Sequence, residues 1–467
     1  MQIKKKDVKF GQIPKPALTE AGKPIDLTDI TMKEHYEKIM NRMIEENLDF
    51  LFIYADREHG GNFGYLTGFE PRFEEAALVL HKDGTAYLML GNESVKMGRY
   101  ARIAAEVIQV PYFSLPNQPM EGGRGLKKLI EDAGIKEGMH GGLAGWKMFT
   151  SPFEENDYLF ETPYFLVNTV LEILGGAGSV KNMTRLFIHP QNGARTCVNA
   201  NEIAHYEYGA SKASGCIYRL MEELEPGKSE LELAGNLAAD GQPHTTQAIC
   251  AAGERFKNAV VAPRSNNVKC SDRFSMSMGL RGGLTCRTGY VAQGEQDLPI
   301  GEEAYLEQVV KPYYAALATW YSSIRIGMEA GLIYDLIEEV IPRDIYGWTL
   351  NPGHLTASEE WMSSPFYENS KVILESGMMF QMDIILSVPG YAGSNAEDGI
   401  VLADKELREQ LKAQYPQMWD RLQNRRRYMK DVIGIEIAEE VLPMSTLNGY
   451  LRPYLLAKEK AMYIQSK

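Results

Sequence analysis

Hydrophobic residues in the first part of the chain gather in short apolar runs. Residues 49–54 (DFLFIY) form one run, and residues 76–80 and 85–90 form two more. Runs of this length bounded by polar residues predict buried strands. The residues between the second and third runs are His-Lys-Asp-Gly, and an Asp-Gly step between apolar runs is typical of a hairpin.

Helical spacing appears between these runs and dominates the second part of the chain. A Thr-x-x-Glu box that begins at Thr31 predicts a helix over residues 35–46. Residues 201–224 carry apolar side chains on one face, and Glu-Pro-Gly follows them, which predicts a long helix with a defined end. A Ser-x-x-Glu box at Ser229 predicts the next helix. Residues 302–326 are also predicted to be mostly helical.

The pattern of residues changes around positions 191–199, where Pro190, Gly193 and two asparagines are typical of a linker. We therefore divide the chain into domains over residues 1–193 and 194–467. The fold class expected is α/β (α+β), with a smaller mixed amino-terminal domain. The first 30 residues contain three prolines, and we expect them to be an irregular arm that could pack on a neighbour.

Composition excludes several classes of function. The chain has 467 residues and a formal net charge of −13, which argues against a nucleic-acid-binding surface. No apolar run approaches the roughly 20 residues that cross a bilayer, and the basic amino terminus lacks the apolar region of a signal peptide. Five scattered cysteines without a CxxC pair favour free thiols in a reducing compartment. We expect a cytoplasmic protein without membrane or nucleic-acid partners.

Candidate chemistry lies between residues 351 and 404. His354 follows Pro352-Gly353, where the backbone can approach closely. Asp383 stands in an otherwise apolar strand, and a buried carboxylate is costly unless it is paired, protonated or bound to a cation. Glu397 lies beside the apolar run that ends at residue 402. Each residue alone could be structural, but the three together in this order favour a site.

These residues give the chain a resemblance to the pita-bread superfamily, which includes methionine aminopeptidase, aminopeptidase P, prolidase and creatinase. The family's Gly-His step matches Gly353-His354. Its Gly-Met strand ending in an acid matches the strand that reaches Asp383, and its Glu-Asp pair matches Glu397-Asp398. The first half resembles the amino-terminal domain of creatinase and prolidase. The resemblance implies a pita-bread carboxy-terminal domain and assembly as a homodimer.

Metallo-members of the superfamily hold two metals with two aspartates, a histidine and two glutamates. The aspartate positions are matched here by Ser277 and Arg287, and neither is an acid. Two divalent cations need several anionic oxygens. We therefore expect Arg287 to replace the metal as counter-ion to Asp383 and Glu397, with no metal and no other cofactor. Creatinase is the metal-free precedent, but its catalytic histidine is matched by Val261.

A few other side chains could contact substrate. Arg72 could reach across a dimer interface, by analogy with creatinase, and Arg264 could bind a substrate carboxylate, although a surface ion pair is the alternative. Trp361 stands where the family has a second histidine. Cys286 adjoins Arg287, and a nearby cation would lower the pKa of its thiol. Neighbouring residues of a strand point to opposite faces, however, so Cys286 and Arg287 cannot both face the site.

Three functions follow from this reasoning. The first is a metal-independent, creatinase-like hydrolase that cleaves a C–N bond of a small carboxylate-bearing compound, with His354 as the proton-handling group. The second is a pseudo-enzyme that only binds a small molecule. The third is a degenerate Xaa-Pro aminopeptidase or dipeptidase with one metal. Metal content and a screen for ligands that raise the melting temperature discriminate among them.

Overall fold

The computed structural model describes residues 2–19, 21–71, 73–120, 123–258 and 262–465. The chain divides into two compact units, Leu27–Thr196 and a second made of Met1–Asp26 with Cys197–Lys467. This division lies close to the expected linker but differs from the predicted domains in one respect. The first 26 residues belong with the carboxy-terminal part of the chain, because β1 (Val8–Gln12) pairs antiparallel with β15 (Lys460–Ile464).

The unit Leu27–Thr196 is built on a six-stranded sheet with the order β5-β4-β3-β2-β6-β7. Its strands are β2 (Phe50–Ala55), β3 (Ala76–His81), β4 (Ala86–Leu90), β5 (Glu106–Gln109), β6 (His140–Ala144) and β7 (Ser179–Asn182). The predicted hairpin is confirmed, since β3 and β4 pair antiparallel on either side of the Asp-Gly turn. Strand β2 pairs antiparallel with β3 and parallel with β6, so the sheet is mixed.

Helices complete this unit. They are α1 (Asp29–Glu45), α2 (Gly61–Thr67), α3 (Leu126–Asp132), α4 (Tyr164–Leu174) and α5 (Arg185–Ile188). Helix α1 begins six residues before the predicted start, and its cap is Thr28, whose hydroxyl accepts the N–H of Thr31. The predicted Thr31 cap is therefore wrong: Thr31 lies within the first turn, where its N–H still needs an acceptor. Buried side chains of α3 and α4 pack with those of the central strands into one core.

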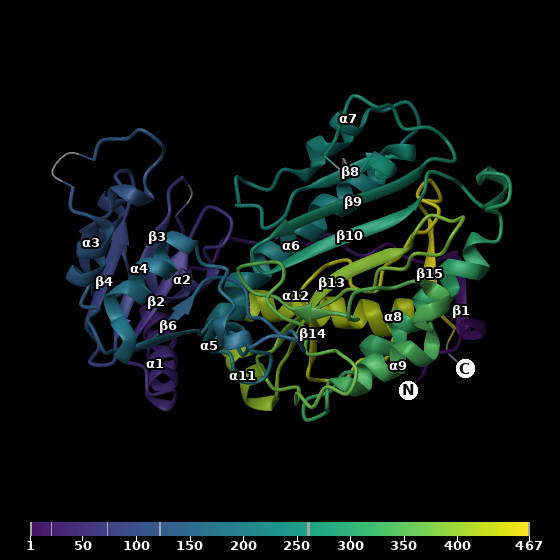
Figure 1. Ribbon diagram of the computed structural model, residues 1–467. Helices are drawn as coiled ribbons and strands as arrows, with labels where there is room; N and C mark the ends of the chain where they lie inside the picture. Colours follow the sequence, from purple (N-terminus) through teal and green to yellow (C-terminus); the bar gives the residue numbers. More distant parts are fainter. Residues whose placement is uncertain (1, 20, 72, 121–122, 259–261, 466–467) are drawn as a thin grey trace. The chain divides into compact units, whose positions relative to one another are not determined.

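The second unit contains a seven-stranded sheet that positions the candidate site (Figure 1). The order β11-β12-β13-β10-β9-β8 is extended by β14, which pairs with β13. The strands are β8 (Ile249–Ala252), β9 (Arg273–Leu280), β10 (Gly283–Tyr290), β11 (His354–Leu355), β12 (Met379–Met382), β13 (Asn395–Leu402) and β14 (Val441–Pro443). Strands β9 and β10 pair antiparallel and are joined by a tight turn.

Seven α-helices are described in this part of the chain. They are α6 (Ala200–Glu223), α7 (Glu230–Ala234), α8 (Lys311–Ser323), α9 (Gly331–Val340), α10 (Arg343–Tyr346), α11 (Lys405–Gln414) and α12 (Pro416–Arg427). Helix α6 packs against β9 and β10, and its bounds lie within one residue of the prediction. The Ser229 capping box opens α7 as predicted. Within the described residues, no helix combines the length and the apolarity that a bilayer crossing requires.

Candidate active site

Strand register decides which side chains share a face of the sheet. Cys286 on β10 lies directly opposite Glu397 on β13 and opposite Ser277 on β9. Paired residues of antiparallel strands project from the same face, and the next residue along each strand projects from the other. Cys286, Glu397 and Ser277 therefore share one face, and Arg287 lies on the opposite one.

The expected role of Arg287 is therefore wrong. Its side chain is 1% exposed, and its Nη2 atom pairs with Asp398 Oδ2 at 2.5 Å. Its other N–H groups donate to backbone carbonyls, including those of Tyr450 (2.9 Å) and Leu447 (2.7 Å). The guanidinium thus neutralises Asp398, and not Asp383 or Glu397, because the two-residue period of β10 turns it away from them.

His354 is placed by a close approach of backbone. Gly353 has φ +112°, and a Cβ atom built there would lie 2.7 Å from the carbonyl oxygen of Gln381. Only glycine meets both conditions without strain. This geometry lets β11 pair with β12, with His354 opposite Gln381. The imidazole is almost fully buried, and its Nδ1 atom lies 3.2 Å from the carbonyl oxygen of Leu355.

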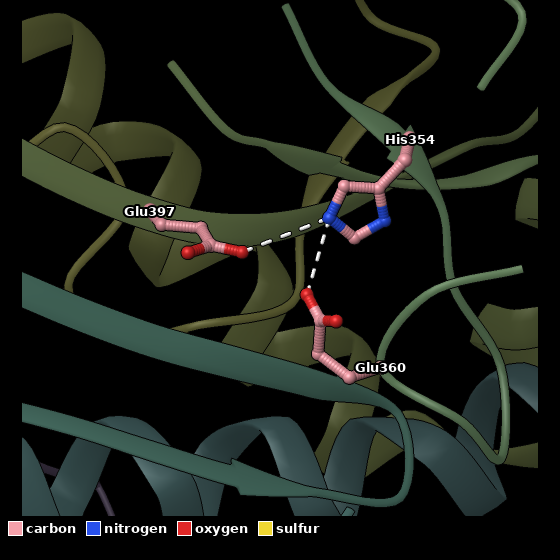
Figure 2. A group of neighbouring side chains, drawn as sticks. All are labelled: His354, Glu360 and Glu397. Atoms are coloured by element: carbon pink, nitrogen blue, oxygen red, sulfur yellow. Dashed lines mark ion pairs between the residues drawn. The ribbon is translucent and has the colours of Figure 1, made fainter. Parts of the chain in front are cut away.

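Two carboxylates lie next to the other nitrogen of His354 (Figure 2). The Nε2 atom is 3.1 Å from Glu360 Oε1 and 3.8 Å from Glu397 Oε1. The nearer contact is an ion-pair distance without the alignment of a hydrogen bond, since Nε2 has no hydrogen-bond partner of good geometry. Figure 2 shows both carboxylates converging on this atom.

Glu360 was not among the site residues predicted from the sequence. It lies in a loop that folds back beside β11, because Leu355 N–H donates to Ser363 and Met362 N–H donates to Leu355. The signal was the Glu359-Glu360 pair shortly after the candidate histidine. The sequence could not show that the loop returns over the imidazole, since this depends on long-range backbone pairing.

Asp383 lies immediately after β12 and is 6% exposed. Its Oδ1 atom is buried without a hydrogen-bond partner. Burial raises the pKa of Asp383 above its usual value, and the neighbouring His354 opposes this rise while the Glu360 charge adds to it. Asp383 and His354 therefore interact electrostatically, and the catalytic role expected for Asp383 stays a prediction.

The charges of the cluster do not balance. Burial raises the pKa of Glu397 well above its usual value, and Asp383 and Glu360 raise it further. Burial would lower the pKa of His354, but Glu360 and Asp383 outweigh it and raise that pKa. Three carboxyl groups thus surround a single imidazole in a low-dielectric site. Such a group of acids requires protons or a bound cation.

The remaining predicted residues have mixed outcomes. Trp361 lies beside the site, with its ring centroid 5.5 Å from that of His354, and it is 52% exposed. The backbone N–H of Arg264 donates to Glu230, a buried carboxylate that also pairs with Arg255. These contacts hold the backbone of this segment, and the role of the Arg264 side chain in binding a substrate carboxylate stays a prediction. Arg72 and Val261 lie outside the described residues.

Cys286, and not Arg287, faces the carboxylates of the site. The sequence alone did not show which of the two residues does so. Burial raises the pKa of its thiol, and Glu397 and Asp383 raise it further, whereas Arg287 lowers it. The carboxylates outweigh the arginine because the guanidinium is already paired on the other face. The thiol is therefore protonated at neutral pH, which makes it a weak nucleophile.

The donor set can be tested against the cations that metallo-members of this superfamily bind. One ligand atom from each of His354, Glu360 and Glu397 lies within 4.8 Å of the others. The unpartnered Oδ1 of Asp383 lies in the same electrostatic neighbourhood. One divalent cation therefore fits the residues present. A pair of cations does not, since Ser277 offers no charge and Arg287 lies on the other face.

Comparison with known proteins agrees with this architecture. Residues 204–404 match the model of metallopeptidase family M24. The predicted pita-bread superfamily is confirmed. The prolidase from Thermococcus sibiricus superposes with a TM-score of 0.61 at 19% identity, covering 80% of this chain and 94% of that one. No curated protein matches the chain.

Two further solved structures are similar to this chain over about the same share of its length. The Xaa-Pro dipeptidase from Bacillus anthracis has a TM-score of 0.58 at 16% identity and covers 80% of this chain and 96% of its own. Dipeptidase PepE from Mycobacterium ulcerans has a TM-score of 0.60 at 14% identity, and the match covers 81% of this chain and 95% of PepE. At these identities the likeness establishes the fold. The predicted fold class is therefore confirmed for most of the chain, and the fold is that of prolidase-type hydrolases.

Proposed function

We propose that the chain is a hydrolase that cleaves the C–N bond of a small carboxylate-bearing compound, and that an Xaa-Pro dipeptide is the first substrate to test. The observation that supports this proposal is the convergence of Glu360 and Glu397 on the buried Nε2 atom of His354, with Asp383 beside them. The fold it shares with prolidases and dipeptidases supports the substrate class.

The expected metal independence is not supported by the contacts of Arg287. It required Arg287 to neutralise Asp383 and Glu397, and that guanidinium is fully engaged by Asp398 and backbone carbonyls. His354, Glu360 and Glu397 would hold a divalent cation. Such a cation supplies Lewis acidity when it is bound.

The transfer of the proton would then fall to a residue of the chain. Asp383 is the proton-handling group, because its Oδ1 atom has no other partner and burial raises its pKa toward the range that suits a general base. It takes a proton from water as the water oxygen bonds to the carbonyl carbon. The C–N bond then breaks, and the same proton passes to the leaving nitrogen. The products are a carboxylic acid and an amine.

Trp361 would line the side of the site that faces the substrate. Its ring lies next to His354, and about half of its surface is exposed to solvent. An aromatic face of this kind suits an apolar ring such as the pyrrolidine of proline. The chemistry itself needs no contact from Trp361, so this residue is proposed to affect KM more than kcat.

The test is turnover by the full chain. The purified protein is freed of metal and then assayed with Xaa-Pro dipeptides and other small amides in the presence of Mn²⁺, Co²⁺ or Zn²⁺. Amine release is expected, and Asp383→Asn is expected to lower kcat by about 10²- to 10⁴-fold while substrate binding persists. Unchanged turnover in Asp383→Asn would contradict the assignment of the proton to this carboxyl group.

A binding protein without catalysis is the second candidate. The observation that favours it is the absence of acids at Ser277 and Arg287, the two strand positions where metallo-members carry aspartates. A compound that raises the melting temperature in a ligand screen but is never turned over, with or without added metal, supports this candidate against the hydrolase.

We also propose that the protein is a homodimer, as the resemblance to creatinase implies, and that it is cytoplasmic, as its composition led us to expect. Light scattering coupled to size-exclusion chromatography measures the oligomeric state. A monomer at micromolar concentration would contradict the dimer.

A further inference from the structure

We propose that Glu360 is the residue that converts this site into a mononuclear cation site, taking over the charge that the acids of strands β9 and β10 provide in metallo-members. The inference deepens the proposed function, because it names the number and class of ions at the same site. It can hold even if the protein has no hydrolytic activity.

Charge is the first argument. Glu360 and Glu397 together carry two negative charges, and their oxygens lie 3.1 and 3.8 Å from one nitrogen of His354. Two carboxylates balance one divalent cation, and the third acid of the cluster, Asp383, is assigned to the proton in the proposed function. A second cation would need further carboxylates on the same face, and β9 and β10 offer Ser277 and Cys286 there.

Unused hydrogen-bonding capacity is the second argument. His354 Nε2 and Asp383 Oδ1 are both buried without a hydrogen-bond partner of good geometry. The two residues are 1% and 6% exposed. Buried polar atoms of this kind are rare in native proteins and indicate a missing ion, water or ligand. Both atoms belong to the same cluster of charges as Glu360.

Preorganisation of the loop is the third argument. The loop that bears Glu360 is closed by the backbone hydrogen bonds between Leu355 and its partners Met362 and Ser363. The Thr356 hydroxyl donates to the carbonyl of Glu359 at 3.0 Å, which fixes the residue before Glu360. The carboxylate of Glu360 is therefore held near Nε2, with a side chain only 17% exposed. Ligands held in place before binding lose less entropy when the ion arrives.

The donor types define the class of ion. One imidazole nitrogen with carboxylate oxygens suits Mn²⁺, Fe²⁺, Co²⁺ or Zn²⁺. Ca²⁺ and Mg²⁺ prefer sites made entirely of oxygen ligands. We therefore expect a first-row transition ion to bind in preference to either of these.

The experiment measures metal binding to the full chain without any substrate. Chelator-treated protein is titrated calorimetrically with Mn²⁺ and with Zn²⁺, and elemental analysis follows dialysis. One ion per chain is expected. Glu360→Gln should weaken binding by at least about tenfold, the lower end of the cost of losing even an outer-shell partner. Glu359→Gln is the matched control, since it removes the adjacent carboxylate from the same loop, and it should bind the ion like the wild type.

Thermal unfolding separates a ligand role from a structural one. In chelator, Glu360→Gln should melt at or above the temperature of the wild type, because one of three crowded carboxylates is gone. The same concentration of added ion should raise the melting temperature of the wild type and of Glu359→Gln by more than that of Glu360→Gln. Two ions per chain, no ion at all, or unchanged affinity in Glu360→Gln would each overturn the proposal. Failure of the hydrolase proposal would instead show as bound ion without turnover.

Discussion

Arg287 and Asp398 form a buried ion pair, 2.5 Å between Nη2 and Oδ2, on the face of the sheet opposite the candidate site. Thr285 and Ser445 also donate to the Asp398 carboxylate, so the pair is satisfied on both sides. The pair explains why an arginine can stand at a strand position where metallo-members carry an acid. It stabilises the junction between β10, β13 and the segment around Leu447, and it leaves the site on the other face without a guanidinium.

Removing this arginine is expected to destabilise the protein strongly. Arg287→Met leaves Asp398 buried without its counter-ion, and breaking a buried pair in this way costs about 3–5 kcal/mol. Equilibrium urea unfolding measures the loss. Arg427→Met is the control, because Arg427 is exposed, and it should change stability by less than about 0.5 kcal/mol. A loss below about 1 kcal/mol for Arg287→Met would contradict the importance of the pair.

A second buried carboxylate should make stability depend on pH. Burial alone would raise the pKa of Glu207, but Arg425 and Arg421 outweigh it and hold that pKa below its usual value. A carboxyl group with a lowered folded-state pKa contributes stability above its unfolded pKa and loses it as pH falls through the folded value. The contribution of Glu207 should therefore be complete at neutral pH and disappear in acid.

Urea unfolding of the wild type and of Glu207→Gln between neutral and acidic pH tests this sign. The difference in unfolding free energy between the two proteins should shrink as pH falls below the usual range of a glutamate pKa. Glu368→Gln, at an exposed position, is the control and should follow the wild type at every pH. A difference that stays constant or grows in acid would show that the arginines do not dominate at Glu207.

Gly353 should be intolerant of a side chain. Gly353→Ala places a Cβ atom 2.7 Å from the carbonyl oxygen of Gln381 at φ +112°, so it suffers both strain and a clash with backbone. A loss of about 1–3 kcal/mol or more is expected, with weaker binding of a cation because His354 moves. Gly227→Ala separates the two effects, since Gly227 has φ +95° and no atom within 4 Å of the added Cβ. Equal losses in the two variants would exclude the clash as a cause.

The cysteines should differ in reactivity. Cys270 is exposed, whereas Cys286 sits against the carboxylates of the site, which with burial raise the pKa of its thiol. Thiolate is the reactive form, so alkylation of Cys286 should be slow at neutral pH. Peptide mass spectrometry after timed labelling with iodoacetamide is expected to find Cys270 labelled first. Early labelling of Cys286 would indicate that its thiol is ionised and would support a role for Cys286 as a nucleophile.

The sequence by itself determined the local elements and the identity of most of the candidate site. Apolar runs and the Asp-Gly step predicted β3 and β4, and apolar periodicity predicted α6 to within one residue. His354, Asp383 and Glu397 were predicted from the cost of burying an acid in an apolar strand, from the Pro-Gly step before the histidine, and from the resemblance to the pita-bread superfamily. These are short-range patterns, and a single sequence contains them.

The tertiary structure decided what the site contains. Strand alternation alone showed that Cys286 and Arg287 face opposite ways, but only the pairing of Cys286 with Glu397 shows which of them faces the acids. Glu360 enters the site because its loop folds back on Leu355, and residues 8–12 join the carboxy-terminal unit because they pair with residues 460–464. Register and loop closure depend on residues far apart in the chain, which local sequence patterns do not encode.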